Sequence, residues 1–358
     1  MDFFEIDKIE LKVFDCTNCG AELKYKAGTT LLICEYCNAK NEIIIQETVV
    51  EELDFEKYIE KLETENLQSE KVIQCKSCGS TSSVDESLKS LYCAYCSSPL
   101  VENDIHEERY IKPSYLLPFN IDNQKVYDLL SKWIDGIWFA PNNLKKAVLS
   151  PIGLRGVYVP YWTYDVKTNS DYTGQKGEYY EVTEGSGENQ TIKRKTKWYS
   201  TSGSVSLFFD DIMIPASGNI DAGSLTKLEP WDTKALVLAN DQYLSGFITE
   251  KYKVNLKDGF LYAKRIMDDR INQAVKSDIG GDDQSVESID TNYSNIQFKH
   301  ILLPVYVSSY RYENKVYHFY VNGRNGKLVG DRPYSQIKII LIVISILLLI
   351  LLFLIFFG

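Results

Sequence analysis

The chain has 358 residues, enough for more than one domain, and its 49 acidic against 39 basic residues give a formal net charge of −10. Residues 1–112 hold 12 Lys and Arg against 23 Asp and Glu, a net of −11, so this part carries the whole acidic excess. Binding to a phosphate backbone relies largely on Lys and Arg, so the charge balance argues against nucleic-acid binding by residues 1–112.

All eight cysteines lie in Cys-x-x-Cys pairs within this acidic region. They form two sets, Cys16, Cys19, Cys34 and Cys37, then Cys75, Cys78, Cys93 and Cys96. Fourteen residues separate the second cysteine from the third in each set, and the whole set recurs after 59 positions. Two such pairs offer four thiolates in the tetrahedron that Zn2+ takes in structural sites. The spacing therefore predicts two zinc ribbons, at residues 1–46 and 73–112, with one structural Zn2+ in each.

Disulfides or a redox Cys-x-x-Cys motif are the alternatives to a metal site. A redox motif has no need of matched sets, and the N-terminus lacks the features of a secretion signal that would lead to an oxidising compartment. Gly20 and Gly79 directly follow a cysteine pair, where a positive φ lets backbone N–H groups turn toward sulfur. A closed four-thiolate site leaves no open coordination position, so both metals are predicted to be structural rather than catalytic.

A helical spacer is predicted between the two cysteine sets, at residues 47–72. Residues 47–71 are rich in Glu, Lys and Leu and contain no Gly or Pro. Phe55, Ile59 and Leu62 fall at positions i, i+4 and i+7, which is the apolar spacing of an amphipathic helix.

Residues 113–336 are rich in aromatic residues and are predicted to form an α+β domain with an antiparallel sheet. Strands are expected over 156–167, 172–182, 191–207, 300–312 and 316–321, with turns at Gly174, Gly177, Gly185 and Gly187. Asp122 is a candidate cap for one helix. A longer helix is expected over 256–277, with Leu261, Ile266, Met267, Ile271 and Val275 facing inward. The tyrosines and tryptophans of this domain are interpreted as the core of the sheet rather than the lining of a groove.

Motifs of known enzyme chemistry do not occur in this sequence. It contains no His-Glu-x-x-His, no Gly-x-Ser-x-Gly and no P-loop. The carboxylate pairs Asp210-Asp211, Asp268-Asp269 and Asp282-Asp283 are interpreted as solvated faces or helix caps, because adjacent side chains point apart. The protein is therefore predicted not to be an enzyme.

Residues 337–358 are predicted to be a transmembrane anchor. Ile339–Phe357 is apolar except for Ser345, and these 19 residues would span about 28 Å as a helix, close to the thickness of a bilayer core. A buried core helix is the alternative, but the segment has no polar face. Arg324, Lys327, Arg332 and Lys338 precede the span, so the positive-inside rule places the N-terminal bulk in the cytoplasm. We expect a tail-anchored, single-pass protein of the cell membrane.

Several motifs, taken in order, resemble one known family. After the two Cys-x-x-Cys-Gly sets come Leu117-Pro-Phe-Asn-Ile, Trp138-Phe-Ala-Pro, Gly156-Val-Tyr-Val-Pro-Tyr-Trp, Leu303-Pro-Val-Tyr and Tyr320-Val-Asn-Gly-Arg-Asn-Gly-Lys. Together they resemble the bacterial TFIIB-type zinc-ribbon-containing membrane proteins, over nearly the whole chain. The resemblance implies metal binding by the eight cysteines and a role in a membrane-stress system that recruits a phage-shock-protein-A-like partner. It implies no catalytic residue.

The function expected from these features is that of an adaptor or scaffold. The ribbons would present rigid, acidic surfaces to protein partners at the cytoplasmic face of the membrane. The alternative is a nucleic-acid-associated or transcription-linked zinc protein, which the acidity of residues 1–112 disfavours.

Overall fold

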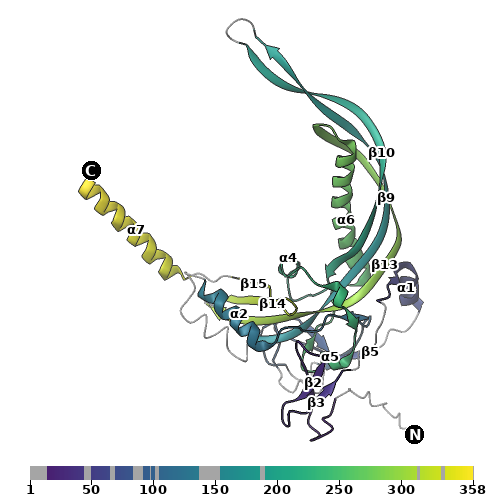
Figure 1. Cartoon of the computed structure of the whole chain (residues 1–358), viewed down its shortest axis with the longest axis vertical. Helices are drawn as coiled ribbons and strands as arrows, with labels where there is room; N and C mark the ends of the chain where they lie inside the picture. The colour runs from purple at the N-terminus through teal and green to yellow at the C-terminus, as the bar shows by residue number, and fades with distance from the viewer. Residues whose placement is uncertain are drawn as a thin grey trace.

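The computed structural model describes residues 14–43, 50–64, 69–83, 92–96, 98–100, 105–136, 154–185, 190–312, 315–331 and 335–357. A long curved arm of β-sheet rises from the body of the protein, and the last helix leaves the body separately (Figure 1). The sequence motif that begins at Trp138 and the basic residue Arg332 lie outside the described residues.

Each set of four cysteines belongs to a small three-stranded antiparallel sheet, with the orders β1-β2-β3 and β6-β5-β7. The strands are β1 (Leu23–Lys26), β2 (Leu31–Cys34), β3 (Lys40–Glu42), β5 (Ser69–Gln74), β6 (Thr81–Ser83) and β7 (Ile105–Arg109). We call residues 14–43 the first cysteine unit and the described residues between 69 and 109 the second cysteine unit. Their sheets differ in construction, because the central strand β2 leads into Cys34 whereas the central strand β5 leads into Cys75.

The central sheet follows the path β10-β9-β13-β14-β15, and all neighbours along it are antiparallel. These strands are β9 (Leu154–Glu184), β10 (Thr191–Pro215), β13 (Asp283–Tyr312), β14 (Lys315–Asn322) and β15 (Leu328–Gly330). Short strands border it: β4 (Leu53–Asp54), β8 (Tyr115–Leu116), β11 (Val237–Leu238) and β12 (Ile248–Thr249). The predicted antiparallel sheet is confirmed along this path. The described chain is mostly strand, however, so the predicted α+β class gives the helices too much weight.

Strand β9 separates two cores that contain the two cysteine units. Successive side chains of a strand point to opposite faces of a sheet. Tyr158 accordingly packs in one cluster with Cys16, Leu23, Tyr25 and Cys34, which belong to the first unit. Its neighbours Val157 and Val159 pack in another cluster with Cys75, Cys93, Ala94 and Tyr95, which belong to the second unit. The two units therefore lie against opposite faces of the central sheet.

The aromatic residues of β9 from Tyr158 to Tyr164 form core, as the sequence predicts. Tyr158, Tyr161, Trp162 and Tyr164 are fully buried. The predicted turns at Gly174 and Gly177 are wrong, because both residues lie inside the continuous strand β9. They mark close packing instead: a Cβ on Gly174 would lie 2.5 Å from the Ser285 carbonyl oxygen, and one on Gly177 would lie 2.8 Å from Thr196 Cγ2.

Two helices form where capping and periodicity predict them. Helix α2 (Asn123–Asp135) begins after Asp122, whose side chain accepts a hydrogen bond from the Lys125 N–H at 2.9 Å. Helix α1 (Phe55–Thr64) occupies the middle of the predicted spacer, but the residues from Ser69 onward belong to β5. Shorter helical segments are α4 (Ala222–Lys227), η3 (Thr233–Ala235) and α5 (Asp241–Leu244).

Helix α6 (Leu256–Ile279) covers one face of the arm that β9, β10 and β13 build (Figure 1). Its buried residues recur at four-residue steps: Ala263, Met267, Ile271, Val275 and Ile279. Met267, Ile271 and Val275 therefore face inward as predicted. Leu261 and Ile266 do not, because they fall beside this stripe and are 56% and 38% exposed.

The end of the arm is a bare two-stranded ribbon. Strand β13 joins β9 only as far as the Asp283–Gly177 pair, whereas β9 and β10 remain paired out to Glu184 and Thr191. We call residues 178–184 and 191–197 the tip ribbon. Tyr179, Tyr180 and Ile192 are exposed there, and the Arg194 guanidinium lies 4.4 Å from the centre of the Tyr179 ring.

A buried cluster of charges fixes the segment before α1 to the sheet. Lys299 of β13 is buried, and its Nζ lies 2.9 Å from Glu52 Oε1, 2.9 Å from Asp211 Oδ1 and 3.7 Å from Asp165 Oδ2. The Asp211 N–H also donates to Asp165 Oδ1 at 2.7 Å. The prediction that Asp211 belongs to a solvated face or a helix cap is therefore wrong, since it lies at an irregularity of β10 and pairs with a buried cation.

Helix α7 (Gln336–Phe357) contains a segment, Lys338–Phe356, that is long and apolar enough to cross a membrane, and none of it is buried in the protein. It is the one such helix within the described residues. The alternative of a core helix is thereby removed.

Candidate metal centres

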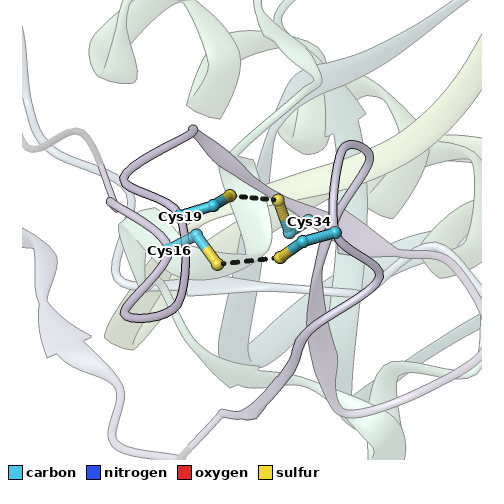
Figure 2. Close-up of side chains that lie close together, drawn as sticks. Cys16, Cys19 and Cys34 are labelled. Atoms are coloured by element: carbon cyan, nitrogen blue, oxygen red, sulfur yellow. Dashed lines mark hydrogen bonds between the residues drawn. The ribbon is translucent and has the colours of Figure 1, made fainter.

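The first cluster of sulfur atoms joins two turns that flank β1 and β2. Cys16 and Cys19 lie in the turn before β1, and Cys34 and Cys37 lie at the end of β2 and in the turn that follows. The sulfur atoms of Cys16 and Cys37 are 3.5 Å apart, as are those of Cys19 and Cys34 (Figure 2). All four sulfur atoms lie within 4.8 Å of one another.

The second cluster repeats this arrangement after β5. Cys75 and Cys96 place their sulfur atoms 3.6 Å apart, and Cys78 and Cys93 place theirs 3.5 Å apart. These four sulfur atoms also lie within 4.8 Å of one another. The structure therefore brings the cysteines together in the same two sets of four that the spacing predicts.

Both clusters fit a tetrahedral metal ion. Four thiolates at a Zn–S distance of about 2.3 Å lie about 3.8 Å from one another, close to the separations seen here. No disulfide is formed by any of the eight cysteines, and a disulfide would hold two sulfur atoms at about 2.0 Å. Each cluster can therefore hold one metal ion with four sulfur ligands, which leaves no coordination position for a substrate.

One backbone turn recurs in all four Cys-x-x-Cys pairs. The N–H of the first cysteine donates to the carbonyl oxygen five residues further on. These bonds are Cys16–Ala21 at 2.7 Å, Cys34–Ala39 at 3.0 Å, Cys75–Ser80 at 2.9 Å and Cys93–Ser98 at 2.8 Å. They close the chain around each pair, and both sulfur atoms of the pair lie in the same four-sulfur cluster.

The residue after the pair must take a left-handed conformation to close this turn. Gly20 and Gly79 do so with φ of 72° and 77°, as their places in the sequence predict. Asn38 takes the same role in the turn after Cys37, with φ of 59°, and its N–H donates to the Cys34 carbonyl at 2.9 Å. The sequence pattern did not single out Asn38, although asparagine is among the few other residues that tolerate this conformation.

Each cluster contains a thiol whose pKa is lowered. Hydrogen bonding to the Asn18 side chain and to the Ala39 N–H lowers the pKa of Cys37 to about 6. The hydrogen bond with Cys93 lowers the pKa of Cys78 to about 4, although burial opposes this shift. The thiolate is the metal-binding form of cysteine, so each site offers one ligand that is already ionised at neutral pH.

The second unit is fixed to the sheet by a tyrosine inside its last cysteine pair. Tyr95 is 3% exposed, and its hydroxyl donates to Glu250 Oε2 at 2.6 Å. Glu250 is also buried, and it accepts hydrogen bonds from Ser217 Oγ at 2.8 Å and Asn219 Nδ2 at 2.6 Å. Burial raises the pKa of Glu250, and these donors oppose the shift. Sequence reasoning missed both Tyr95 and Glu250, which lie 155 positions apart.

The first unit is fixed by its hairpin instead. The Tyr25 hydroxyl donates to the Phe119 carbonyl at 3.0 Å, and the Tyr25 N–H donates to the Ser245 carbonyl at 3.1 Å. Ser245 Oγ in turn donates to the Leu23 carbonyl at 2.6 Å. Both cysteine clusters are therefore held against the sheet, through different parts of each unit.

We expect metal analysis of the purified protein to find about two zinc ions per chain, because each cluster supplies one complete set of four sulfur ligands. Elemental analysis by plasma mass spectrometry, with protein concentration from amino-acid analysis, gives this ratio. A ratio of one or none, or occupation by another metal in the native host, would contradict the expectation.

No protein-family model and no solved structure matches the chain. The chain is 26% identical over 240 residues to the uncharacterized protein YdjG of Bacillus subtilis (strain 168), a match that covers 64% of this chain and 66% of that relative. The match thus spans just under two thirds of the relative's own length. Since that relative is itself uncharacterized, the similarity brings no activity to this chain.

Proposed function

We propose that the protein is a membrane-anchored adaptor that holds a protein partner at the cytoplasmic face of the membrane. Its two cysteine units would each fold around a structural Zn2+ as a zinc ribbon. One observation supports the proposal above all. Two four-sulfur clusters are attached to the same sheet, and the chain continues from that sheet into a helix that is able to span a membrane.

The chemistry of the clusters favours a binding role over a catalytic one. A metal with four thiolate ligands has no free position at which to activate water or substrate. Such a metal stabilises the fold of a small unit, because the hydrophobic core of a unit of this size is too small to do so alone. A surface that is already rigid loses little conformational entropy when a partner binds.

The resemblance to the TFIIB-type zinc-ribbon membrane proteins adds a specific candidate partner. We propose a phage-shock-protein-A-like protein, recruited to the membrane under stress. The basic residues Lys327, which precedes α7, and Lys338, which lies in the first turn of α7, support the cytoplasmic orientation.

The proposal is tested with the full chain in detergent and a purified phage-shock-protein-A-like protein from the same organism. We expect saturable binding that is lost when chelation removes both metals. In parallel, short duplex and single-stranded nucleic acids are titrated at low salt. Tight, salt-sensitive nucleic-acid binding without partner binding would favour the transcription-linked alternative and overturn the adaptor proposal.

Deleting residues 337–358 should move the protein from the membrane fraction to the soluble fraction, because α7 is the one candidate span among the described residues. The cysteine units and the sheet should remain folded, since Lys338–Phe356 is not buried against them. Fractionation followed by zinc analysis measures both effects. Persistent membrane association of the shortened chain would show that another surface binds lipid.

A further inference from the structure

The duplicated cysteine units carry a tyrosine at the same position, and the two copies have different environments. Tyr36 lies in Cys34-Glu-Tyr-Cys37, and Tyr95 lies 59 residues later in Cys93-Ala-Tyr-Cys96. The same backbone turn supports both, through the bonds Cys34–Ala39 and Cys93–Ser98. Yet Tyr36 is 82% exposed, whereas Tyr95 is 3% exposed. We call residues 34–37 the first tip and residues 93–96 the second tip.

The second tip shows what such a tyrosine can bind. The Tyr95 ring belongs to the core cluster beneath the sheet, and its hydroxyl reaches a recessed carboxylate, that of Glu250. The Glu250 carboxylate is kept in place by donors from Ser217, Gly218 and Asn219. Beside this contact, β6 runs against the segment after β12, where the Lys251 N–H donates to the Thr81 carbonyl at 3.1 Å. The contact thus combines an aromatic anchor, a recessed acceptor and an extended backbone.

The first tip has the same anchor without a receptor in the described part of the chain. Within the described ranges the Tyr36 hydroxyl has no hydrogen-bond partner, although the unit is held through Tyr25 and Ser245. Tyrosines on rigid supports are frequent hot spots of protein interfaces, because few rotamers are lost on binding. Glu35 replaces the buried Ala94 of the second tip and forms an exposed ion pair with Lys24. A receptor for the first tip must therefore be polar at its rim.

We propose that the first tip is the docking point for the protein partner, and that the partner receives Tyr36 in a recess that contains an Asp or Glu carboxylate. The inference rests on the proposed adaptor function and specifies its interface. In a second copy of this chain the Glu250 recess is already filled by Tyr95, so we assign the receptor to a different protein.

The test uses the full chain in its native membranes, with the photo-crosslinking residue benzoylphenylalanine in place of Glu35. This position adjoins Tyr36, and the substitution removes the exposed ion pair with Lys24, an interaction of small energy. Tyr36→Phe and Tyr36→Ala are compared in this background. Tyr92→Phe, at an exposed tyrosine of the second unit, is the matched control. Zinc content verifies that each variant is folded. Crosslinkers at Tyr92 and Trp198 sample other surfaces.

The expected result is one protein adduct from position 35, with the crosslinked peptide at or next to an Asp or Glu. Its yield should fall about 10-fold in Tyr36→Phe, the effect of removing a hydrogen bond to a charged group, and remain unchanged in Tyr92→Phe. Substituting the acidic residue found in the partner should reduce the yield equally.

Other outcomes separate this inference from the function on which it rests. Protein adducts from position 92 or 198 but not from position 35 would overturn the docking point and leave an adaptor. An adduct with a second copy, with lipid or with nucleic acid, or a yield unaffected by Tyr36→Ala, would also overturn it. No protein adduct from any of the three positions would overturn the adaptor function as well.

Discussion

Replacing Cys75 and Cys78 together with serine is expected to lower the zinc content from about two ions per chain to about one and to unfold the second cysteine unit. A structural Zn2+ contributes roughly 10–16 kcal/mol of apparent binding free energy, which in such units is folding free energy. The short strands β5, β6 and β7 cannot replace it, because a unit of this size buries too little apolar surface. The first unit and α7 should be unaffected.

Hydrogen exchange of the full chain in detergent measures this effect segment by segment. Amides of residues 69–83 and 92–100 should lose protection, while those of β1 and β2 keep it. The matched control, Cys16 and Cys19 replaced with serine, should show the reverse pattern with the same loss of one ion. Tyr95→Phe should keep both ions and weaken only the attachment to Glu250. Full protection of residues 69–83 without the metal would contradict the assignment of a structural site.

Lys299→Met is expected to destabilise the sheet by roughly 3–5 kcal/mol, the cost of removing one partner from a buried ion pair. The Lys299 ammonium pairs with Glu52, Asp165 and Asp211, and all three carboxylates would remain in the variant without this cation. Guanidinium unfolding in detergent, followed through tryptophan fluorescence, measures the loss. Lys167→Met on the exposed face of β9 is the control, with an expected change within about 0.5 kcal/mol. Equal stabilities would mean that the cluster contributes nothing.

The destabilisation by Lys299→Met should grow with pH. Burial, together with the hydrogen bond that the protonated Asp165 carboxyl donates to Glu52, raises the pKa of Asp165 to about 7 even with the lysine present. A carboxyl whose pKa is raised by folding binds protons more tightly in the folded state, so it lowers stability as the pH rises from its unfolded pKa, about 4, toward and above 7. Without Lys299 this shift becomes larger. The difference between variant and wild type should therefore be smaller at pH 5 than at pH 8, and adding Asp165→Asn should remove part of the pH dependence.

The sequence predicts those features whose physical cause is local. Cysteine spacing predicts the turns around the Cys-x-x-Cys pairs, because the turn that begins at Cys16 or Cys75 involves only the next five residues. Asp122 predicts the start of α2 for the same reason, since a cap acts on residues three positions away. The continuous strand β9 was not predicted, because a glycine that signals a turn locally also permits close contact with a distant strand, as Gly174 does with Ser285.

The contacts that place the units on the sheet depend on distant residues, and no local pattern encodes them. Tyr95 meets Glu250 across 155 positions, and Lys299 meets Glu52 across 247. The charge of Glu52, Asp211 and Lys299 alone predicts an exposed surface, and only the fold shows that Lys299 is buried and pairs with both carboxylates. In the sequence, Tyr95 could be noticed only through the 59-residue offset between the two cysteine sets, which aligns it with Tyr36.

The course of the strands determines how the arm would respond to a pulling force. The tip ribbon lies at the far end of β9 and β10, whereas β13 runs back from the arm to the body and continues through β14 and β15 toward α7. Tension between the tip ribbon and α7 would therefore act along the strands and load the hydrogen bonds between β9 and β13 in shear, from Gly177–Asp283 to Leu154–Ser308. Bonds loaded in shear share the force, whereas bonds that are peeled apart break one after another. The paired length of β9 and β13 would thus share a tension applied between the tip ribbon and α7 among many hydrogen bonds.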